Sequence, residues 1–432
     1  METCRHDHIN VMYKLETLNN GSKILLAPQK DTEAVTVLVL VKVGSRHETD
    51  ELNGISHFIE HLLFKGTKKR PTSLDISKEL DGVGADYNAF TGKDHTGYYI
   101  KVSHQKLELA LEIVSDMLFN SLFDKKEIEK ERGVIIEEIN MYDDNPLMSI
   151  GNLFEEVMFK GSRLGRDIAG PKKNIRSLSR GQIIGYFKNY YRSQNLLVGI
   201  GGRFNKIKAK RLVKKYFLQQ KVKVKKALPE KSMAEQAKPR IKIKHKKTEQ
   251  VQIALGFPAY GINNPKNYPL TLLTVILGGN MSSRLFIEIR EKLGLAYHIR
   301  SYVTSYADVG ALSIFAGLDK AKVNLALETI NRELQKVTVD PVSPEEVYRA
   351  KEFIKGKLTL SLEDSAARIQ WLATQQLIQG RVETLEAKLK KIDRITVQQI
   401  QNVAREIILN HKLNLAVIGP YKDNKHFLNI FK

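Results

Sequence analysis

The first half of this 432-residue chain recurs in the second half. The matches are residues 179–184 with 396–401 at an offset of 217, residues 198–201 with 416–419 at 218, and Glu127-Ile128 with Glu346-Val347 at 219. Each match is weak alone, but the three agree on an offset close to half the chain length. Such agreement indicates two copies of one structural unit. The chain is therefore expected to fold as two homologous domains.

Each copy mixes strand and helix patterns. Residues 18–26 read as a hairpin on an Asn-Gly turn, and residues 35–41 form an apolar, β-branched run typical of a strand. Residues 105–120 have the apolar spacing of an amphipathic helix. A further helix is predicted from residue 124 to 141, since Asn145-Pro146 prevents its continuation. We expect two α/β units.

A basic segment separates the two copies. Residues 203–247 hold 18 Lys and Arg against two acids, which accounts for +16 of the net charge of +21. Alternation of Lys with Val or Ile predicts an exposed strand, and the flanking prolines predict a linker. Either a solvated linker or a polyanion site would explain the charge. No aromatic residue is interleaved with the lysines after Phe217, so we expect no nucleic-acid partner. The predicted domains are residues 1–219 and 248–432, joined by a basic linker region at 220–247.

Membrane insertion and a disulfide framework are not expected. The first residues carry acids and no apolar core of a signal peptide, and no run of eighteen apolar residues occurs. These features predict a cytoplasmic protein without a membrane partner. Cys4 is the single cysteine, so a metal would have to be held by His and carboxylate side chains.

A candidate metal motif lies in residues 54–67. On a helix, His57 and His61 project from one face, one turn apart, with Glu60 beside them. This is the geometry of two metal ligands and a base, and His-x-x-Glu-His is the motif of the inverted zincins. A five-residue match arises by chance too often to establish a function alone.

The predicted helix at 124–141 offers carboxylates as further ligands. Glu131 and Glu138 are seven residues apart and therefore share one helical face. Alternatively, the acids of this helix form a solvated face with neighbouring Lys and Arg. At the offset of 219 these two acids align with Ala350 and Lys357, and the counterpart of the His motif, residues 271–280, contains no His or acid. Only the first copy can hold the metal.

Four motifs in this order resemble those of the pitrilysin family, which includes mitochondrial processing peptidase and insulin-degrading enzyme. They are residues 54–67, the run Glu-Arg-x-Val-Ile-x-x-Glu that ends at Glu138, 77 positions beyond His61, residues 278–286, and residues 290–297. The resemblance implies that His57, His61 and Glu138 bind Zn²⁺, that Glu60 is the general base, and that Glu131 orients a ligand.

The resemblance also assigns roles in the second half and in an edge strand. Arg290 and Tyr297 would reach the active site from the opposite domain, where Tyr297 stabilises the developing oxyanion and Arg290 positions the substrate backbone. Residues 86–91 resemble the family's substrate-binding edge strand, which pairs with an extended peptide. Asn88 and Ala89 match its pattern, whereas Phe90 stands where Tyr is frequent.

The expected protein is a zinc metalloendopeptidase with an α+β fold. Each of its two homologous domains would have a mainly antiparallel sheet packed against helices, and one chain would form half of a clamshell. By resemblance we expect a homodimer that encloses a cleft and cleaves peptides or unfolded segments. The alternatives are a specific presequence or propeptide processing peptidase and a noncatalytic relative like the core subunits of respiratory complexes.

Overall fold

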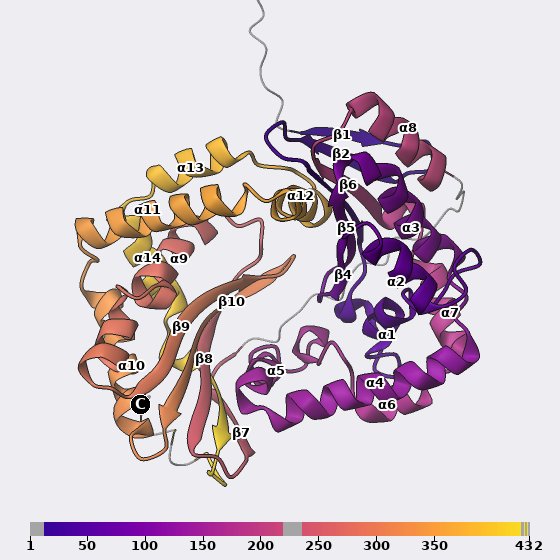
Figure 1. Cartoon of the computed structure of the whole chain (residues 1–432). Coiled ribbons are helices and arrows are strands. Elements are labelled where there is room, and N and C mark those ends of the chain that lie inside the picture. The colour runs from indigo at the N-terminus through magenta and orange to yellow at the C-terminus, as the bar shows by residue number, and fades with distance from the viewer. Residues whose placement is uncertain (1–12, 219–235, 425–426, 428–429, 431–432) are drawn as a thin grey trace, which may run out of the picture.

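The chain forms two sheets, each flanked by helices (Figure 1). The computed structural model describes residues 13–218, 236–424, 427 and 430. The first-half sheet has the order β1-β2-β6-β3-β5-β4, and only the β2–β6 pair is parallel. Its strands are β1 (Lys14–Thr17), β2 (Lys23–Pro28), β3 (Ala34–Val41), β4 (Asp86–Thr91), β5 (Thr96–Ser103) and β6 (Leu196–Gly202). The predicted hairpin is confirmed as β1–β2.

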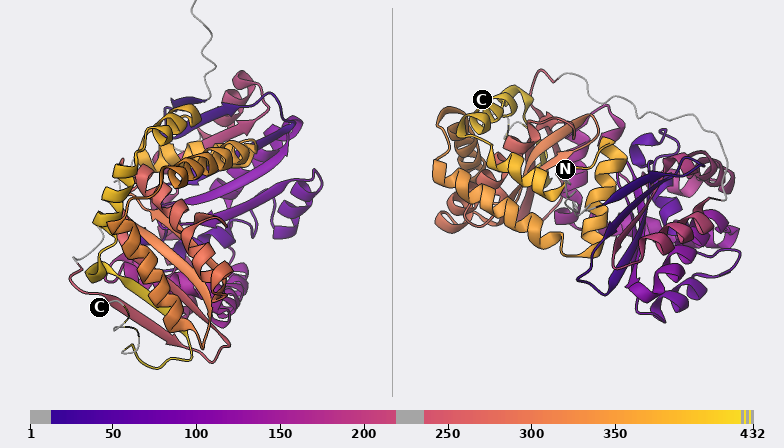
Figure 2. Two further views of the ribbon diagram at one scale, coloured as in Figure 1. Left: turned by 90° about the vertical axis from the view of Figure 1, so that its left-hand side faces the viewer. Right: turned by 90° about the horizontal axis from the view of Figure 1, so that it is seen from above.

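The second-half sheet repeats this topology without a counterpart of β1. Its order is β7-β11-β8-β10-β9, and only the β7–β11 pair is parallel. The strands are β7 (Arg240–His245), β8 (Gln250–Tyr260), β9 (Ala296–Ser305), β10 (Val309–Asp319) and β11 (Asn414–Gly419). Position by position, β2, β6, β3, β5 and β4 correspond to β7, β11, β8, β10 and β9. The predicted two-domain α+β fold is confirmed, and Figure 2 shows the halves side by side.

The helices follow the same repeat. In the first half they are α1 (Ile55–Leu62), α2 (Ser73–Asp81), α3 (Leu107–Asn120), α4 (Lys125–Asp144), α5 (Pro146–Met158), α6 (Lys172–Ser177), α7 (Arg180–Tyr190) and α8 (Lys206–Phe217). In the second half they are α9 (Asn267–Thr274), α10 (Val323–Val339), α11 (Pro344–Ser361), α12 (Ser365–Thr374), α13 (Leu385–Asp393) and α14 (Val397–Ile407).

Helix capping explains two of the three sequence matches. Ser179 and Gln182 form a capping box at the start of α7, and Thr396 and Gln399 form the same box at α14. The Glu127 and Glu346 match falls on the third residue of α4 and of α11, where an acid faces the positive end of the helix. The repeat therefore survives in the sequence where it fixes helix ends.

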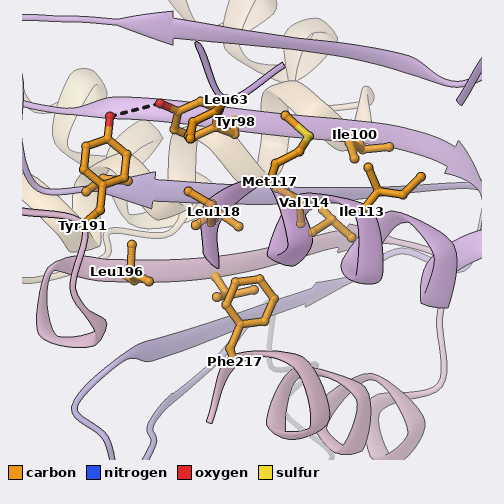
Figure 3. Close-up of a cluster of buried hydrophobic side chains, with 14 of the residues drawn as sticks. Leu63, Tyr98, Ile100, Ile113, Val114, Met117, Leu118, Tyr191, Leu196 and Phe217 are labelled. Carbon is orange, nitrogen blue, oxygen red and sulfur yellow. Dashed lines mark hydrogen bonds between the residues drawn. The ribbon is translucent and has the colours of Figure 1, made fainter. Parts of the chain in front are cut away.

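The first-half core lies between its sheet and the covering helices. Figure 3 shows Ile113 and Val114 of α3 beside Ile100 of β5, all nearly inaccessible to solvent. The one polar contact drawn there joins the hydroxyls of Tyr98 and Tyr191, 3.0 Å apart. Each buried hydroxyl thereby has a partner, which avoids the cost of an unpaired polar group.

Each half also contributes one helix to the sheet of the other. Buried residues of α5, including Ile150 and Phe154, pack on Ala254 and Ile418 of the second sheet. In return, Ile369 and other residues of α12 pack on the first sheet. The two helices begin 219 residues apart, so the exchange is reciprocal.

The first sheet is shaped for this exchanged helix at two glycines of β6. A Cβ atom added at Gly199 would lie 2.8 Å from Cγ1 of Ile369, and one added at Gly201 would lie 2.8 Å from the Ser365 carbonyl oxygen. Such distances are too short for a side chain, so the glycines permit the close approach of α12.

The C-terminal part of the predicted linker region is a strand. Residues 240–245, assigned to the linker at 220–247, form β7 and pair with β11, so that segment was extended too far. Its lysines contact first-half groups: Lys242 pairs with Glu156, and Lys244 lies 2.8 Å from Asp143. These contacts favour a structural role for the charge on this strand. Residues 219–235, with the predicted Lys-Val alternation, lie outside the described residues.

Membrane-spanning helices were not expected. Among the helices that the structure describes, none is long and apolar enough to cross a membrane.

Candidate metal centre

Helix α1, which carries the His motif, begins without an ordinary capping residue. It follows Gly54, whose φ of 103° lies in the left-handed region, and a Cβ atom there would lie 2.5 Å from the Ala169 carbonyl oxygen. The cap comes instead from the buried side chain of Glu48. Its carboxylate accepts hydrogen bonds from the backbone N–H of Gly54 at 2.9 Å and of Ser56 at 2.8 Å. Burial raises the pKa of Glu48, and hydrogen bonds to the carboxylate, including one from Asn53, oppose this shift.

Replacing Glu48 with alanine should destabilise the protein by about 2–4 kcal/mol, because it leaves buried donors at the start of α1 without an acceptor. The loss should appear as a lower midpoint in denaturant unfolding. Glu51→Ala, at an exposed acid in the same segment, serves as the matched control and should leave the midpoint unchanged. Equal midpoints for the two variants would show that Glu48 does not hold the helix.

The structure brings the three predicted metal ligands together. His57 and His61 come from α1, and Glu138 comes from α4. The Nε2 atoms of the two histidines are 3.3 Å apart, and Oε2 of Glu138 lies 3.5 Å from Nε2 of His57 and 3.6 Å from that of His61. A tetrahedral zinc ion with bonds of about 2.0–2.1 Å separates its ligand atoms by about 3.3–3.4 Å. The donor set therefore fits zinc in both chemistry and spacing.

The electrostatics of the cluster also suit a cation. Burial and the neighbouring His61 lower the pKa of His57 to about 3, so this imidazole is neutral near pH 7 with a lone pair available. Burial raises the pKa of Glu138. Nδ1 of His57 is buried and has no hydrogen-bond partner among the described residues.

Glu131 lies behind His61, next to the ring nitrogen that faces away from the candidate metal position. Its Oε2 is 3.1 Å from Nδ1 of His61, and its Oε1 is 2.6 Å from Nζ of Lys65. Burial raises the pKa of Glu131, but the hydrogen bonds to His61 and Lys65 outweigh it and lower the pKa overall. A carboxylate that accepts from Nδ1 fixes the tautomer in which Nε2 is free to bind a metal. Lys65, which sequence analysis missed, is part of the residues 54–67 motif.

Glu60, the predicted base, belongs to α1, and its side chain contacts the edge strand β4. Burial raises its pKa, and the Thr91 hydroxyl donates a hydrogen bond to its Oε2. Thr91 ends β4, so this contact holds the carboxylate near the predicted substrate-binding strand. The sequence pattern predicts that Thr91 lies in that strand but gives no sign of this contact.

The predicted substrate-binding residues lie on β4. Among the strands that the structure describes, β4 pairs only with β5, which leaves its other backbone edge without a strand partner. Asn88 is exposed, and Ala89 and Phe90 are partly buried. The Phe90 ring occupies the space over Gly97, where a Cβ atom would lie 2.3 Å from the ring. The phenyl group therefore packs on the sheet and leaves the backbone to meet a ligand.

Arg290 and Tyr297 lie together in the second half. The Arg290 guanidinium is 5.5 Å from the centre of the Tyr297 ring, and Tyr297 is 76% exposed. Within the described residues, no hydrogen bond, ion pair or ring contact joins them to His57, Glu60 or His61. Tyr297 is the second residue of β9. The β9–β10 turn at the other end of this strand contacts the first half through an ion pair of 2.9 Å between Asp308 and Arg46. Residues 298–305 of the strand lie between Tyr297 and that turn, which separates the two by about 30 Å.

The second half supplies no equivalent metal cluster. Within the described part of the chain, His57, His61 and Glu138 form the one group of at least three metal-ligating side chains whose ligand atoms lie within 4.8 Å of one another. Ala350 and Lys357 on α11 are the counterparts of Glu131 and Glu138 at the repeat offset.

Comparisons with known proteins agree with this division. Residues 23–172 match the sequence profile of the insulinase family (peptidase family M16), and residues 177–354 match that of the M16 inactive domain. The chain is 35% identical to an uncharacterized zinc protease of Streptomyces coelicolor, over 95% of this chain and 90% of the relative. It is 34% identical to the uncharacterized zinc protease YmxG of Bacillus subtilis, over 95% of this chain and 98% of the relative.

Solved structures share the fold. A protease from Helicobacter pylori superposes with a TM-score of 0.90 at 26% identity, covering 94% of this chain and 99% of that protein. A Pseudomonas fluorescens structure described as a peptidase M16 inactive domain has a TM-score of 0.86 at 17% identity, covering 95% and 98%.

Proposed function

Because this chain belongs to the M16 family of peptidases, we propose that it is a zinc-dependent metalloendopeptidase that hydrolyses peptides or unfolded segments in an enclosed cleft. The observation that carries the proposal is the spacing of 3.3 to 3.6 Å between the ligand atoms of His57, His61 and Glu138. Glu60 lies one residue before His61 on the same helix, close to an unpaired strand edge.

The residues divide the reaction between them. His57, His61 and Glu138 would hold zinc, and Glu131 keeps His61 in the required tautomer. The chemistry that zinc supplies when bound is Lewis acidity, which acidifies water and polarises the scissile carbonyl. Glu60 takes a proton from the attacking water and passes it to the leaving amine. Its raised pKa favours this exchange, because a base poised nearer to neutrality both accepts and returns the proton.

Strand β4 is the proposed substrate platform. An extended peptide that pairs with its free edge is held through backbone hydrogen bonds, which tolerate many side chains. Only unfolded segments can present such an edge, so peptides are the expected substrates and folded proteins are not. A cytoplasmic location remains a prediction from the N-terminal sequence.

We further propose that the enzyme works as a homodimer in which Arg290 and Tyr297 act on the metal site of the partner subunit. Among the described residues, no hydrogen bond, ion pair or ring contact joins Arg290 or Tyr297 to the cluster of its own chain. This supports the arrangement, since a donor to the oxyanion must lie within hydrogen-bond distance of it. The intact ligand set and base argue against a noncatalytic relative. The basic stretch between the domains disfavours a reader of positively charged presequences.

The proposal predicts about one zinc ion per chain and cleavage of an unstructured peptide library by the purified protein. Zinc content measured by elemental analysis should fall together with cleavage on chelation, and added zinc should restore both. A protein that cleaves peptides equally well after complete removal of metal would overturn the proposal.

A further inference from the structure

A large cavity lies in the half without metal ligands. Its volume is about 1700 Å³, and its walls come from α9, β9, α11, α12 and the segment 379–395 that includes α13. Trp371 on one wall belongs to α12, which packs on the first sheet, while Tyr302 on another belongs to β9 of the second sheet. All of the lining residues come from the second half, and one wall is α12, the helix that packs on the first sheet; Figure 1 shows where α12 and β9 lie.

This cavity is the repeat counterpart of the metal centre. The metal cluster lies between α1, α4 and the edge strand β4. The cavity lies between α9, α11 and the edge strand β9, which occupy the same positions in the second copy. The second copy therefore has a cavity at the position of the metal centre, but it lacks the carboxylates that would bind a cation.

Its charge has the opposite sign to that of the metal centre. Two acids line the cavity, Glu383 and Glu406, and each pairs with a lysine, Lys391 and Lys266 respectively, at 2.6 Å. Four further cations on the walls have no ion pair in the described part of the chain: Arg300, Arg381, Lys388 and Arg394. The lining therefore carries a net positive charge, because the two acids pair with only two of its cations.

Lys388 lies in an environment that disfavours its positive charge. Its ammonium group lies 5.7 Å from the centre of the Tyr268 ring, and Lys391 lies 5.4 Å from the same ring. Burial lowers the pKa of Lys388, and the proximity of Lys391 lowers it further although Glu383 acts against both. A bound carboxylate would relieve this repulsion, because an opposite charge stabilises the charged form.

We propose that this cavity binds an acidic segment of the peptide substrate, away from the bond that is cut. The inference rests on the proposed peptidase function and adds a substrate preference to it. A volume above the range of about 300–1,000 Å³ typical of small-ligand sites suits a peptide. Trp371, Tyr268 and Tyr302 provide surfaces for apolar side chains, and Gln379 provides an amide group for a peptide backbone.

Binding can be measured separately from cleavage in the Glu60→Gln protein. Two fluorescent, unstructured peptides of equal length would be compared by anisotropy, one with a run of Glu and one with Gln in its place. The acidic peptide should bind more tightly, and Arg381→Gln combined with Lys388→Gln should raise its Kd by about tenfold, the equivalent of two partly buried charge contacts. The difference in affinity between the two peptides should thereby largely disappear.

Two matched variants test the site. Lys390→Gln removes an exposed lysine of the same helix that lies outside the cavity and pairs with Glu386 at 2.6 Å, and it should leave the Kd of the acidic peptide unchanged. Lys388→Arg keeps the charge and should preserve tight binding. Equal affinity for both peptides, or an equal loss in the Lys390 variant, would overturn the proposal even if the wild-type protein cleaves peptides. Selective binding by a protein that cleaves nothing would instead overturn the peptidase function alone.

Discussion

Replacing Glu60 with glutamine is expected to lower kcat for an unstructured peptide by about 10²–10⁴-fold, the usual contribution of a general base. Glutamine has nearly the same size and can still accept the hydrogen bond from Thr91, so α1 and β4 should keep their relative positions. It cannot take a proton from water. Because the metal-ligating cluster consists of His57, His61 and Glu138, zinc content should stay at the wild-type level. Single-turnover cleavage and elemental analysis on the same sample measure both quantities.

Glu137→Gln provides the control for this loss. Glu137 is next to the proposed ligand Glu138 in sequence, yet it is exposed and accepts a hydrogen bond from Asn140 at 3.1 Å. The same chemical change there should leave kcat within about twofold, as surface substitutions usually have small effects. If Glu60→Gln cleaved as fast as the wild-type protein, another group would have to be the base.

Sequence spacing predicted which side chains of the candidate site share one face of a helix. His57 and His61 share a face because they are four residues apart, and Glu131 and Glu138 do so because they are seven apart. Glu48 and Thr91 escaped prediction because each acts through a tertiary contact, the first on the start of α1 and the second on Glu60. A glycine where α1 should have a capping residue was the one available signal for Glu48.

The parts of the fold that depend on local sequence patterns were predictable, and those that depend on tertiary contacts were not. Capping residues and strand patterns are local, so they preserved the repeat and most elements within it. The exchange of α5 and α12 depends on which sheet face each helix meets, and the amphipathic pattern of a helix does not specify its partner. The alternation of Lys with Ile predicted a strand at β7, but these residues were included in the linker region because their lysines resemble a solvated segment. Lys242 and Lys244 instead pair with first-half acids.

Mixed dimers should reveal which subunit supplies Tyr297. Tyr297→Phe removes one donor to the developing oxyanion and should slow cleavage by about 10²–10³-fold. A purified heterodimer of one Glu60→Gln chain and one Tyr297→Phe chain should regain about half of the wild-type activity, because one of its two symmetric sites combines Glu60 with Tyr297 of the partner subunit. Chains carrying different affinity tags allow this heterodimer to be isolated and its kcat compared with that of each parent homodimer.

The reciprocal pairing sharpens the test. A heterodimer of wild-type chain with the double variant Glu60→Gln, Tyr297→Phe contains the same four side chains in a different arrangement. If Tyr297 acts across the dimer, neither site is complete and activity stays near that of the single variants. If Tyr297 acts within its own chain, the wild-type subunit keeps a complete site, so this heterodimer would be half active and the first one inactive. Because no contact joins Tyr297 to the metal cluster of its own chain among the described residues, we expect action across the dimer.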